Sequence, residues 1–204
     1  MMYRADNDLA FLLQYENVAW YEDGKVRITQ NSIWRIIMLE LRRLTDSAGM
    51  DIYSMLQAMP YEENGLMNKA HGLSFEEFRV WLAAKKRESE AEELMDGWKV
   101  PSTTFWLYDG ETPVGFGSVR HFLTDALRKV GGHIGYGIAP QFRGKGYGNE
   151  ILRLLLIEAK KRGIDRVLVT IHKDNAASQA VALKNGGVIK EETDERVLVW
   201  IETK

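Results

Sequence analysis

The chain has 204 residues, of which 45% are hydrophobic and 27% are charged, enough for one medium-sized globular domain. Its 27 basic and 29 acidic residues give a formal net charge of −2, which argues against a nucleic acid as partner. The absence of cysteine excludes disulfides, cysteine-ligated zinc, iron–sulfur clusters and thiol nucleophiles.

The first residues are not typical of a targeting signal. Arg4 is followed by two aspartates, and the apolar run 9–13 is too short and lacks a cleavage site. No apolar stretch approaches the roughly 20 residues that a membrane span needs. We therefore expect a cytoplasmic protein with no membrane partner. Within 18–28, Asp23-Gly24 predicts a β-hairpin in an N-terminal extension, residues 1–37, ahead of a main domain, residues 38–204.

The first part of the main domain mixes strands and helices. Residues 38–44 alternate and predict a strand, and 46–59 have an apolar helical period that ends before Pro60. We expect a loop over 61–73. Ser74 and Glu77 have the spacing of a capping box, which predicts a helix start. Its charged tract, 85–93, is interpreted as a solvated helix end. Strands 103–108 and 113–120 follow, joined at Asp109-Gly110.

The second part of the main domain has clearer periodicity. A strand containing several glycines, 132–139, ends at Pro140, and an amphipathic helix is predicted over 149–162. A buried strand at 166–171, a helix at 175–184 and strands at 188–190 and 197–201 complete the chain. Strands on both sides of two helices predict an α/β or α+β layered fold with one mixed sheet.

The loop between that strand and that helix is the most informative motif. It reads Ile-Ala-Pro-Gln-Phe-Arg-Gly-Lys-Gly-Tyr-Gly over 138–148, with glycines at alternate positions. Such a backbone turns tightly, and its amides, together with the positive end of the next helix, form a phosphate site. Arg143 and Lys145 add mobile positive charge. The spacing fits neither the Rossmann nor the Walker pattern. A glycine-rich turn without a ligand is the remaining alternative.

The loop resembles the acetyl-CoA pyrophosphate loop of the Gcn5-related N-acetyltransferases (GNAT). The matching residues are Arg143-x-x-Gly146-x-Gly148 after Ile138-x-Pro140. Gln141-x-x-Gly144-x-Gly146 also fits, but the Ile-x-Pro spacing favours the first register. A second match, Asn175-x-x-Ser178, resembles the family's helix along the pantetheine arm. The order of elements from about residue 38 to 202 agrees as well.

The resemblance implies a GNAT-like sheet, mixed but mostly antiparallel, with helices on both faces. It also implies a V-shaped splay between the strand ending at Ile138 and the strand 166–171. Acetyl-CoA would be the cosubstrate, with its pantetheine paired to backbone groups at Ile138 and Ala139 and its pyrophosphate on the loop amides. The implied cofactor-binding residues are Ile138, Ala139, Arg143, Gly144, Lys145, Gly146, Tyr147, Gly148, Asn149, Asn175 and Ser178.

Catalytic side chains are harder to assign. The family often has a thiolate-protonating Tyr seven residues after the helix-opening Asn, where this chain has Ala182. Tyr136 is the nearest replacement, although a strand Tyr can equally be a core aromatic. His133 could deprotonate the amine or serve as a structural histidine. Strand alternation places these two on opposite faces. His172 and Asp174 are lesser candidates, which more simply shape the turn before the last helix.

The resemblance implies transfer of an acetyl group to a primary amine by direct attack, which a chain without cysteine permits. The acceptor would be a small-molecule or peptide amine, and no metal is expected. Glu62, Glu63 and Asn64 lie where the family borders its acceptor pocket, where they would attract a cationic amine or remain solvated. Two alternatives stay open: an acyl-CoA-binding or sensing module without turnover, and another phosphate-binding αβ protein. A homodimer contact through residues 1–37 is also compatible.

Overall fold

The computed structural model describes residues 19–22, 25–28, 39–95 and 99–204. The chain divides into two units, Met1–Leu39 and Glu40–Lys204. In the first unit, β1 (Ala19–Glu22) and β2 (Lys25–Ile28) pair in an antiparallel hairpin with Glu22 opposite Lys25. This hairpin lies at the predicted position, and the Asp23-Gly24 turn itself is outside the described residues.

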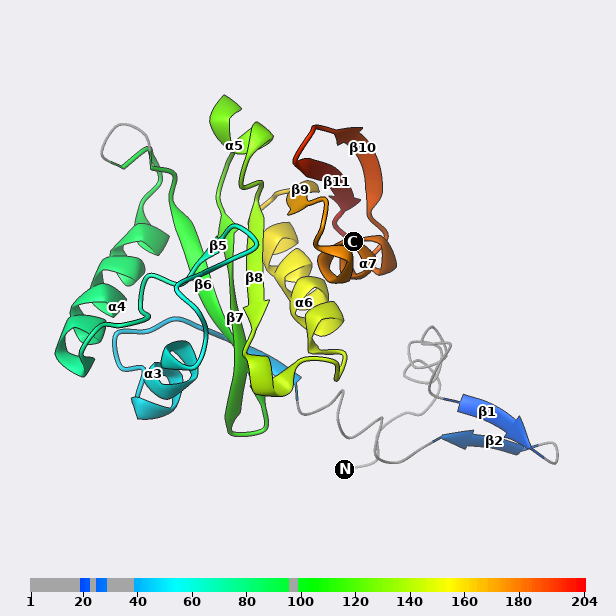
Figure 1. The fold of residues 1–204 in the computed structure, drawn as a ribbon, viewed down its shortest axis with the longest axis horizontal. Coiled ribbons are helices and arrows are strands. Elements are labelled where there is room, and N and C mark those ends of the chain that lie inside the picture. The colour runs from blue at the N-terminus through cyan, green and yellow to red at the C-terminus, as the bar shows by residue number, and fades with distance from the viewer. Residues whose placement is uncertain (1–18, 23–24, 29–38, 96–98) are drawn as a thin grey trace. The chain divides into compact units, whose positions relative to one another are not determined.

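A four-stranded sheet forms the centre of the second unit (Figure 1). Its order is β3 (Leu39–Arg43), β6 (Ser102–Asp109), β7 (Thr112–Arg120) and β8 (Ile134–Ile138). The predicted turn after Asp109 is present, because β6 and β7 pair antiparallel with Asp109 opposite Thr112. Strand β8 pairs antiparallel with β7 and is the last strand of this sheet.

A second sheet has the order β10 (Val188–Glu192), β11 (Arg196–Glu202) and β9 (Arg166–His172), all antiparallel. Strands β8 and β9 therefore belong to different sheets. They approach each other at the start of β8, where the amide of His133, the residue before β8, donates to the Leu168 carbonyl of β9 at 2.7 Å. Beyond this point no ladder joins them, which confirms the expected splay.

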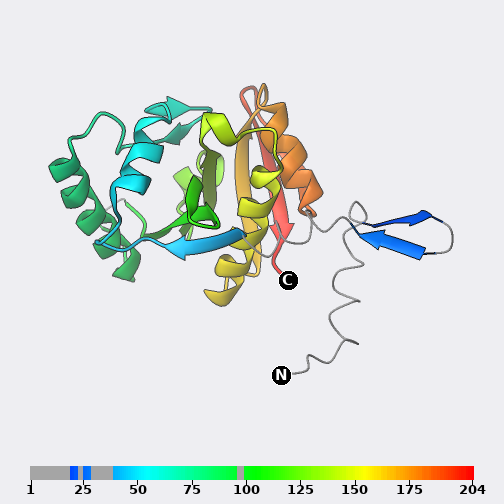
Figure 2. The ribbon, with the colours of Figure 1, turned by 90° about the horizontal axis from the view of Figure 1, so that it is seen from below.

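Helices cover both faces of the central sheet (Figure 2). One layer contains α3 (Met50–Gln57) and α4 (Phe75–Glu90), and the other contains α6 (Tyr147–Lys161) and α7 (Ala176–Lys184). Phe116 packs in the core below α3 and α4, whereas a side chain at Gly117 would meet Leu155 of α6. Because neighbouring strand residues face opposite ways, this alternation buries β7 on both faces. A short helix, α5 (Asp125–Lys129), precedes β8.

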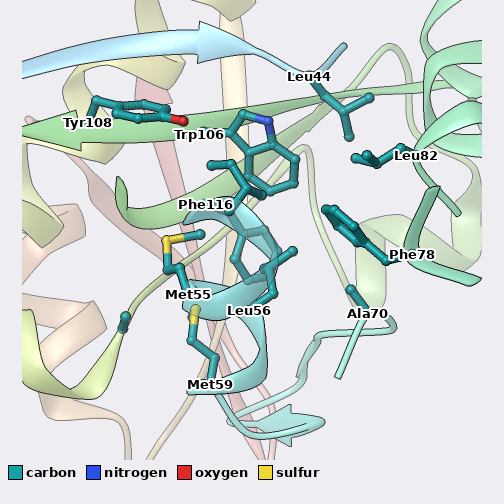
Figure 3. Packing of buried hydrophobic residues seen from close by; sticks show 12 residues of the cluster. Leu44, Met55, Leu56, Met59, Ala70, Phe78, Leu82, Trp106, Tyr108 and Phe116 are labelled. Carbon is teal, nitrogen blue, oxygen red and sulfur yellow. The ribbon is translucent and has the colours of Figure 1, made fainter. Parts of the chain in front are cut away.

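The core between the α3–α4 layer and the sheet is rich in aromatic rings (Figure 3). Trp106 and Phe116 of the sheet lie over Phe78 and Leu82 of α4. The same cluster includes Met55 of α3 and Met59, which follows that helix. Phe78 stacks on Trp81 at 5.9 Å between ring centroids, and Tyr53 meets Phe75 edge to face at 5.4 Å. This packing fixes the position of the segment between α3 and α4, which approaches the end of β8.

The local predictions are largely confirmed. The capping box is present, since the Glu77 amide donates to Ser74 Oγ at 3.3 Å and the Ser74 amide to Glu77 Oε2 at 2.8 Å. The loop predicted over 61–73 contains a small hairpin, β4 (Glu62–Glu63) and β5 (Leu66–Met67). Helix α5 was not predicted. Among the described residues, no helix has the length and apolar character needed to cross a bilayer.

The interpretation of 85–93 as a solvated helix end is wrong at Glu88, which is only 4% exposed. Its carboxylate pairs with Lys85 at 2.7 Å and with Lys99. Burial by itself raises the pKa of Glu88, but the hydrogen bonds from the two lysines outweigh it and lower the pKa overall. Lys99 reaches this position because the chain folds back beside α4, where Met95 and Lys99 form a β-bridge.

Candidate active site

The loop between β8 and α6 has the geometry of an anion site. Gly144 and Gly146 adopt positive φ angles of 75° and 86°, and no atom lies within 4 Å of the side-chain position at either glycine. Among the described residues, the amides of Gly144, Lys145 and Gly146 have no acceptor. The Gly148 amide is in the first helical turn, where intrahelical acceptors are lacking. Amides with no acceptor therefore line open space at the positive end of α6.

Other loop residues hold this conformation in place. The Arg143 side chain is not a mobile charge, because its Nε donates to the Ile138 carbonyl at 3.0 Å and its guanidinium binds the Glu63 carboxylate at 3.0 and 2.5 Å. The Tyr147 hydroxyl donates to the Asp109 carboxylate at the β6–β7 turn. Lys145 Nζ lies 5.6 Å from the centre of the Phe142 ring. The loop is thus anchored at several points.

Asn149, in the first turn of α6, has a polar atom that the protein leaves unpaired. Its Oδ1 atom is buried and has no hydrogen-bond partner within the described part of the chain. The backbone N–H of Asn149 donates to the Gly146 carbonyl at 3.1 Å. A buried acceptor without a donor is costly, and it is normally paired by water or a ligand. Asn149 therefore marks a second polar contact point beside the loop.

The edge of β8 faces the splay with only part of its backbone available. The Ala139 amide donates to Val114 and its carbonyl accepts from Phe142, so both groups of Ala139 are engaged within the protein. Because backbone groups alternate along an antiparallel strand, the amides of Tyr136 and Ile138 point to the opposite edge, toward β9. The Ile138 carbonyl is occupied by Arg143. This leaves the amides of Tyr136 and Ile138, rather than the backbone groups of Ala139, for pairing in the splay.

Tyr136 places its hydroxyl on the α7 side of the splay. That hydroxyl is buried and has no hydrogen-bond partner among the described residues. Burial raises the pKa of Tyr136 to about 12, although the nearby Ser178 hydroxyl offsets part of this effect. At neutral pH the group is therefore protonated and can donate one hydrogen bond. Tyr136 and Ser178, predicted from separate motifs, are brought together here.

His133 does not suit the role of general base. Its Nδ1 accepts a hydrogen bond from the Leu168 amide at 2.9 Å, and its own amide and carbonyl bond to β9 and β7. The residue is 8% exposed, and its ring meets Trp200 edge-on. Burial, with help from Arg128 and Arg120, lowers the pKa of His133 to about 4. These contacts close the narrow end of the splay, which is a structural role.

Helix α7 begins beside the splay, as the second motif predicts. Asn175 is its N-cap, with Oδ1 accepting from the Ser178 amide at 3.0 Å. The turn before it is shaped by the His172 carbonyl, which accepts from the Asn175 amide, and by the Asp174 carbonyl, which accepts from Ala176. Ala182, in α7 itself, is fully buried, so this position presents no polar group to the splay.

The β4–β5 hairpin crosses the open end of the splay. A side chain at Gly137 would lie 2.6 Å from Leu66 Cδ2, so Leu66 rests directly on the backbone of β8. At the other side, the side-chain position of Gly65 lies 3.1 Å from His172 Nε2 and 3.3 Å from the Arg196 guanidinium. Arg196 donates to His172 Nε2 at 2.9 Å. The hairpin thus reaches from β8 to β9 and β11.

This hairpin and Arg196 were missed from the sequence. The signal that could have found the hairpin is Gly135-x-Gly137 within a strand, because interior strand glycines often mark close approach of another segment. Of the three acceptor-side candidates, Glu63 binds Arg143, and Glu62 Oε1 accepts from the Gly65 amide at 2.7 Å. Asn64 takes the hairpin turn with a positive φ of 52°. Glu62 is exposed to solvent, whereas the Glu63 carboxylate is paired with Arg143.

The comparisons with known proteins agree with this geometry. The sequence profile of the acetyltransferase (GNAT) domain matches residues 38–188. No curated protein sequence matches the chain significantly.

Several solved structures share the fold. The ribosomal α-N-protein acetyltransferase RimL, in complex with coenzyme A, has a TM-score of 0.61 at 18% identity, over 81% of this chain and 94% of that one. YncA, a putative acetyltransferase from Salmonella typhimurium with acetyl-CoA, has 0.54 at 13%, over 82% and 95%. The Campylobacter jejuni N-acetyltransferase PseH with acetyl-CoA has 0.54 at 12%, over 81% and 99%. At these identities the likeness establishes the fold.

Proposed function

Because the chain belongs to the GNAT acetyltransferase family, we propose that it transfers an acetyl group from acetyl-CoA to a primary amine by direct attack. The observation that carries this proposal is the pairing of two features at one end of β8. The loop with its unpaired amides lies where β8 ends, and the splay between β8 and β9 opens at the same end. A phosphate-bearing arm held on the loop can therefore extend into the splay.

The residues present fit coenzyme A. Gly144, Gly146 and Gly148 offer amides to a pyrophosphate in the open space beside the loop, with Arg143, Lys145, Tyr147 and Asn149 holding or extending that surface. Ile138 would supply a backbone amide to the pantetheine arm. Ala139 would hold the end of β8 in place through its own backbone hydrogen bonds to Val114 and Phe142. Asn175 and Ser178 border the arm from α7. When bound, acetyl-CoA supplies a thioester whose carbonyl carbon accepts the amine.

The reaction forms an N–C bond and breaks the C–S bond of the thioester, and the amine proton leaves to solvent. The Tyr136 amide, which points to the same edge of β8 as the Ile138 amide, would stabilise the oxygen on which negative charge develops, as a single oxyanion donor. The Tyr136 hydroxyl would donate a hydrogen bond to the departing sulfur. Its pKa of about 12 favours donation of a hydrogen bond over complete loss of the proton. We propose Tyr136, in place of the family's helix Tyr, as the group that contacts the thiolate.

The test measures free thiol released from acetyl-CoA across a panel of primary amines, together with coenzyme A binding by calorimetry. We expect saturable binding of coenzyme A and thiol release that depends on the amine. A Tyr136→Phe variant should keep coenzyme A affinity and lose most of kcat. Folded protein that does not bind coenzyme A would refute the proposal.

One alternative is favoured by a specific observation. Position 182 carries a buried alanine where the family often has its thiolate-protonating tyrosine. A GNAT-fold acyl-CoA-binding or sensing module without turnover would have this property. Tight binding of acetyl-CoA with no acetylation of any amine in the panel would support that alternative over the enzyme.

A further inference from the structure

A cavity of about 370 Å³ lies at the C-terminal end of α6. Its floor includes Thr103 and Phe105 of β6 and Val119, which pairs with Thr103 from β7. Phe105 pairs with Gly117, whose side-chain position faces Leu155 of α6, so the cavity lies on the sheet face that α6 covers. The 15 residues of α6 span about 22 Å and separate this cavity from the loop at the other end of the helix.

Two arginines of the cavity lining have no carboxylate partner among the described residues. Arg43, the last residue of β3, donates to Ser89 Oγ at 3.1 Å. Arg162, which follows α6, donates to Thr103 Oγ1 at 3.5 Å. Neither arginine forms an ion pair within the described part of the chain. Each guanidinium has five N–H donors, so most of its donors remain available for a ligand.

The two guanidiniums are close enough to repel each other. Burial, and after it the charge of Arg43, lowers the pKa of Arg162. Both arginines also act on His121, whose Nε2 lies 2.9 Å from Thr103 Oγ1. Burial, together with Arg162 and Arg43, lowers the pKa of His121 to about 4. Neighbouring positive charges are unfavourable on their own, and such perturbed groups are common at ligand sites.

The charges and the apolar floor of the cavity favour one class of anion. Lys161 and Glu158 in the lining pair at 2.7 Å, so their charges cancel and the two arginines leave an excess of positive charge. A phosphate monoester carries a charge of about −1.5 to −2 near pH 7, and its three acceptor oxygens can pair with two guanidiniums. A carboxylate carries a single charge and is satisfied by one guanidinium. Phe105 and Val119 offer apolar contact to the organic part of such a ligand.

We propose that this cavity is a second ligand site, which binds a small organic phosphate between Arg43 and Arg162. The phosphate oxygens accept hydrogen bonds from both guanidiniums, and the organic part lies on Phe105 and Val119. The cavity volume of about 370 Å³ is within the range of small-molecule sites. The inference does not depend on the proposed function, because the cavity and the loop are at opposite ends of α6.

The experiment titrates phenyl phosphate into the full chain by isothermal calorimetry, with inorganic phosphate and benzoate as comparison ligands. We expect phenyl phosphate to bind at least about threefold more tightly than inorganic phosphate, because its ring adds apolar contact. Benzoate has the same ring but a single charge and no third oxygen. It should bind at least about tenfold more weakly than phenyl phosphate.

Substitutions separate this cavity from the loop between β8 and α6. Arg43→Gln and Arg162→Gln should each weaken the binding of phenyl phosphate at least about tenfold. Because each change relieves repulsion, Tm should fall by less than about 2 °C, so that the loss is not one of folding. Arg162→Lys, which keeps the charge and loses the planar fork, should weaken binding to a smaller extent. The matched control is Arg79→Gln, an exposed arginine on α4, which should bind phenyl phosphate like the unchanged chain.

The loop is the other place where a phosphate could bind, and Gly146→Ala distinguishes the two. This variant should keep its affinity for phenyl phosphate if the ligand lies between the arginines. Loss of binding in Gly146→Ala but in neither arginine variant overturns the inference and leaves the proposed function intact. The absence of saturable binding, or equal affinities for benzoate and phenyl phosphate, overturns the inference as well.

Discussion

Replacing Gly146 by alanine separates the backbone strain of the loop from its binding role. Gly146 has a φ of 86° at the start of α6, and no atom lies within 4 Å of the side-chain position. The left-handed conformation costs a non-glycine residue about 1–2 kcal/mol, partly offset by about 0.4–1 kcal/mol from the less flexible unfolded chain. The net loss of stability is about 1 kcal/mol. For a domain of this size, Tm should fall by about 2–4 °C.

The effect on coenzyme A binding should be larger, because the new methyl group occupies the open space beside the loop amides. A hydrogen bond to a charged group is worth about 1.5–3 kcal/mol. Losing one such bond to the pyrophosphate weakens affinity roughly 10- to 100-fold. Gly163→Ala is the matched control, since Gly163 has a φ of 82° and equally open surroundings at the other end of α6.

Thermal melting and isothermal calorimetry with coenzyme A measure the two effects on both variants. We expect similar Tm shifts and weakened binding only in Gly146→Ala. Unchanged affinity in Gly146→Ala would refute the assignment of the loop as the phosphate site. Equal loss of affinity in the two variants would show that the effect comes from stability alone.

Three further predictions concern the splay. His133 has a pKa of about 4 in the folded protein and about 6.5 in the unfolded chain. Its contribution to the free energy of unfolding is therefore fully present above pH 6.5, and up to about 3 kcal/mol of it is lost as pH falls toward 4. Urea unfolding across this range should show a smaller loss in His133→Gln. Tyr136→Phe should lower kcat at unchanged KM. Its Tm should stay within about 1 °C or rise, because an unpaired hydroxyl is removed. A fall in kcat that is accompanied by a large fall in Tm would contradict a catalytic role. Glu63→Gln should change stability by under about 1 kcal/mol, since the pair is partly exposed, and tighten coenzyme A binding by freeing Arg143; weaker binding in calorimetry would contradict this.

The elements that were predicted well depend on residues close together in the chain. The capping box at Ser74 spans three residues, and the β6–β7 turn lies in the pair Asp109-Gly110. The tight turn between β8 and α6 could also be predicted, because Gly144 and Gly146 adopt their left-handed conformations between neighbouring elements. In each case the side chain or glycine acts on its own backbone, so no distant partner is needed.

The errors have the opposite origin. Glu88 was assigned to a solvated helix end because Lys99, eleven residues later, was not known to fold back onto it. For His133, the sequence does not show that Nδ1 accepts from the amide of Leu168, 35 residues away, which favours the structural role over that of a base. The segment 61–73 contains a hairpin rather than only a loop, because Leu66 packs directly on the backbone of β8 at its glycines, where no side chain stands in the way.

By itself, the sequence determined the order of most elements, the glycine turn between β8 and α6 and the Asn-capped helix, because these arise from local backbone geometry. Only the tertiary structure decided which of the candidate side chains have polar atoms left for chemistry. It engages both backbone groups of Ala139, joins Arg143 to Glu63 across 80 residues, and leaves the Tyr136 hydroxyl without a partner beside the splay. Hydrogen-bonding capacity is used up by whichever groups the fold brings within about 3 Å, and that depends on contacts between distant segments.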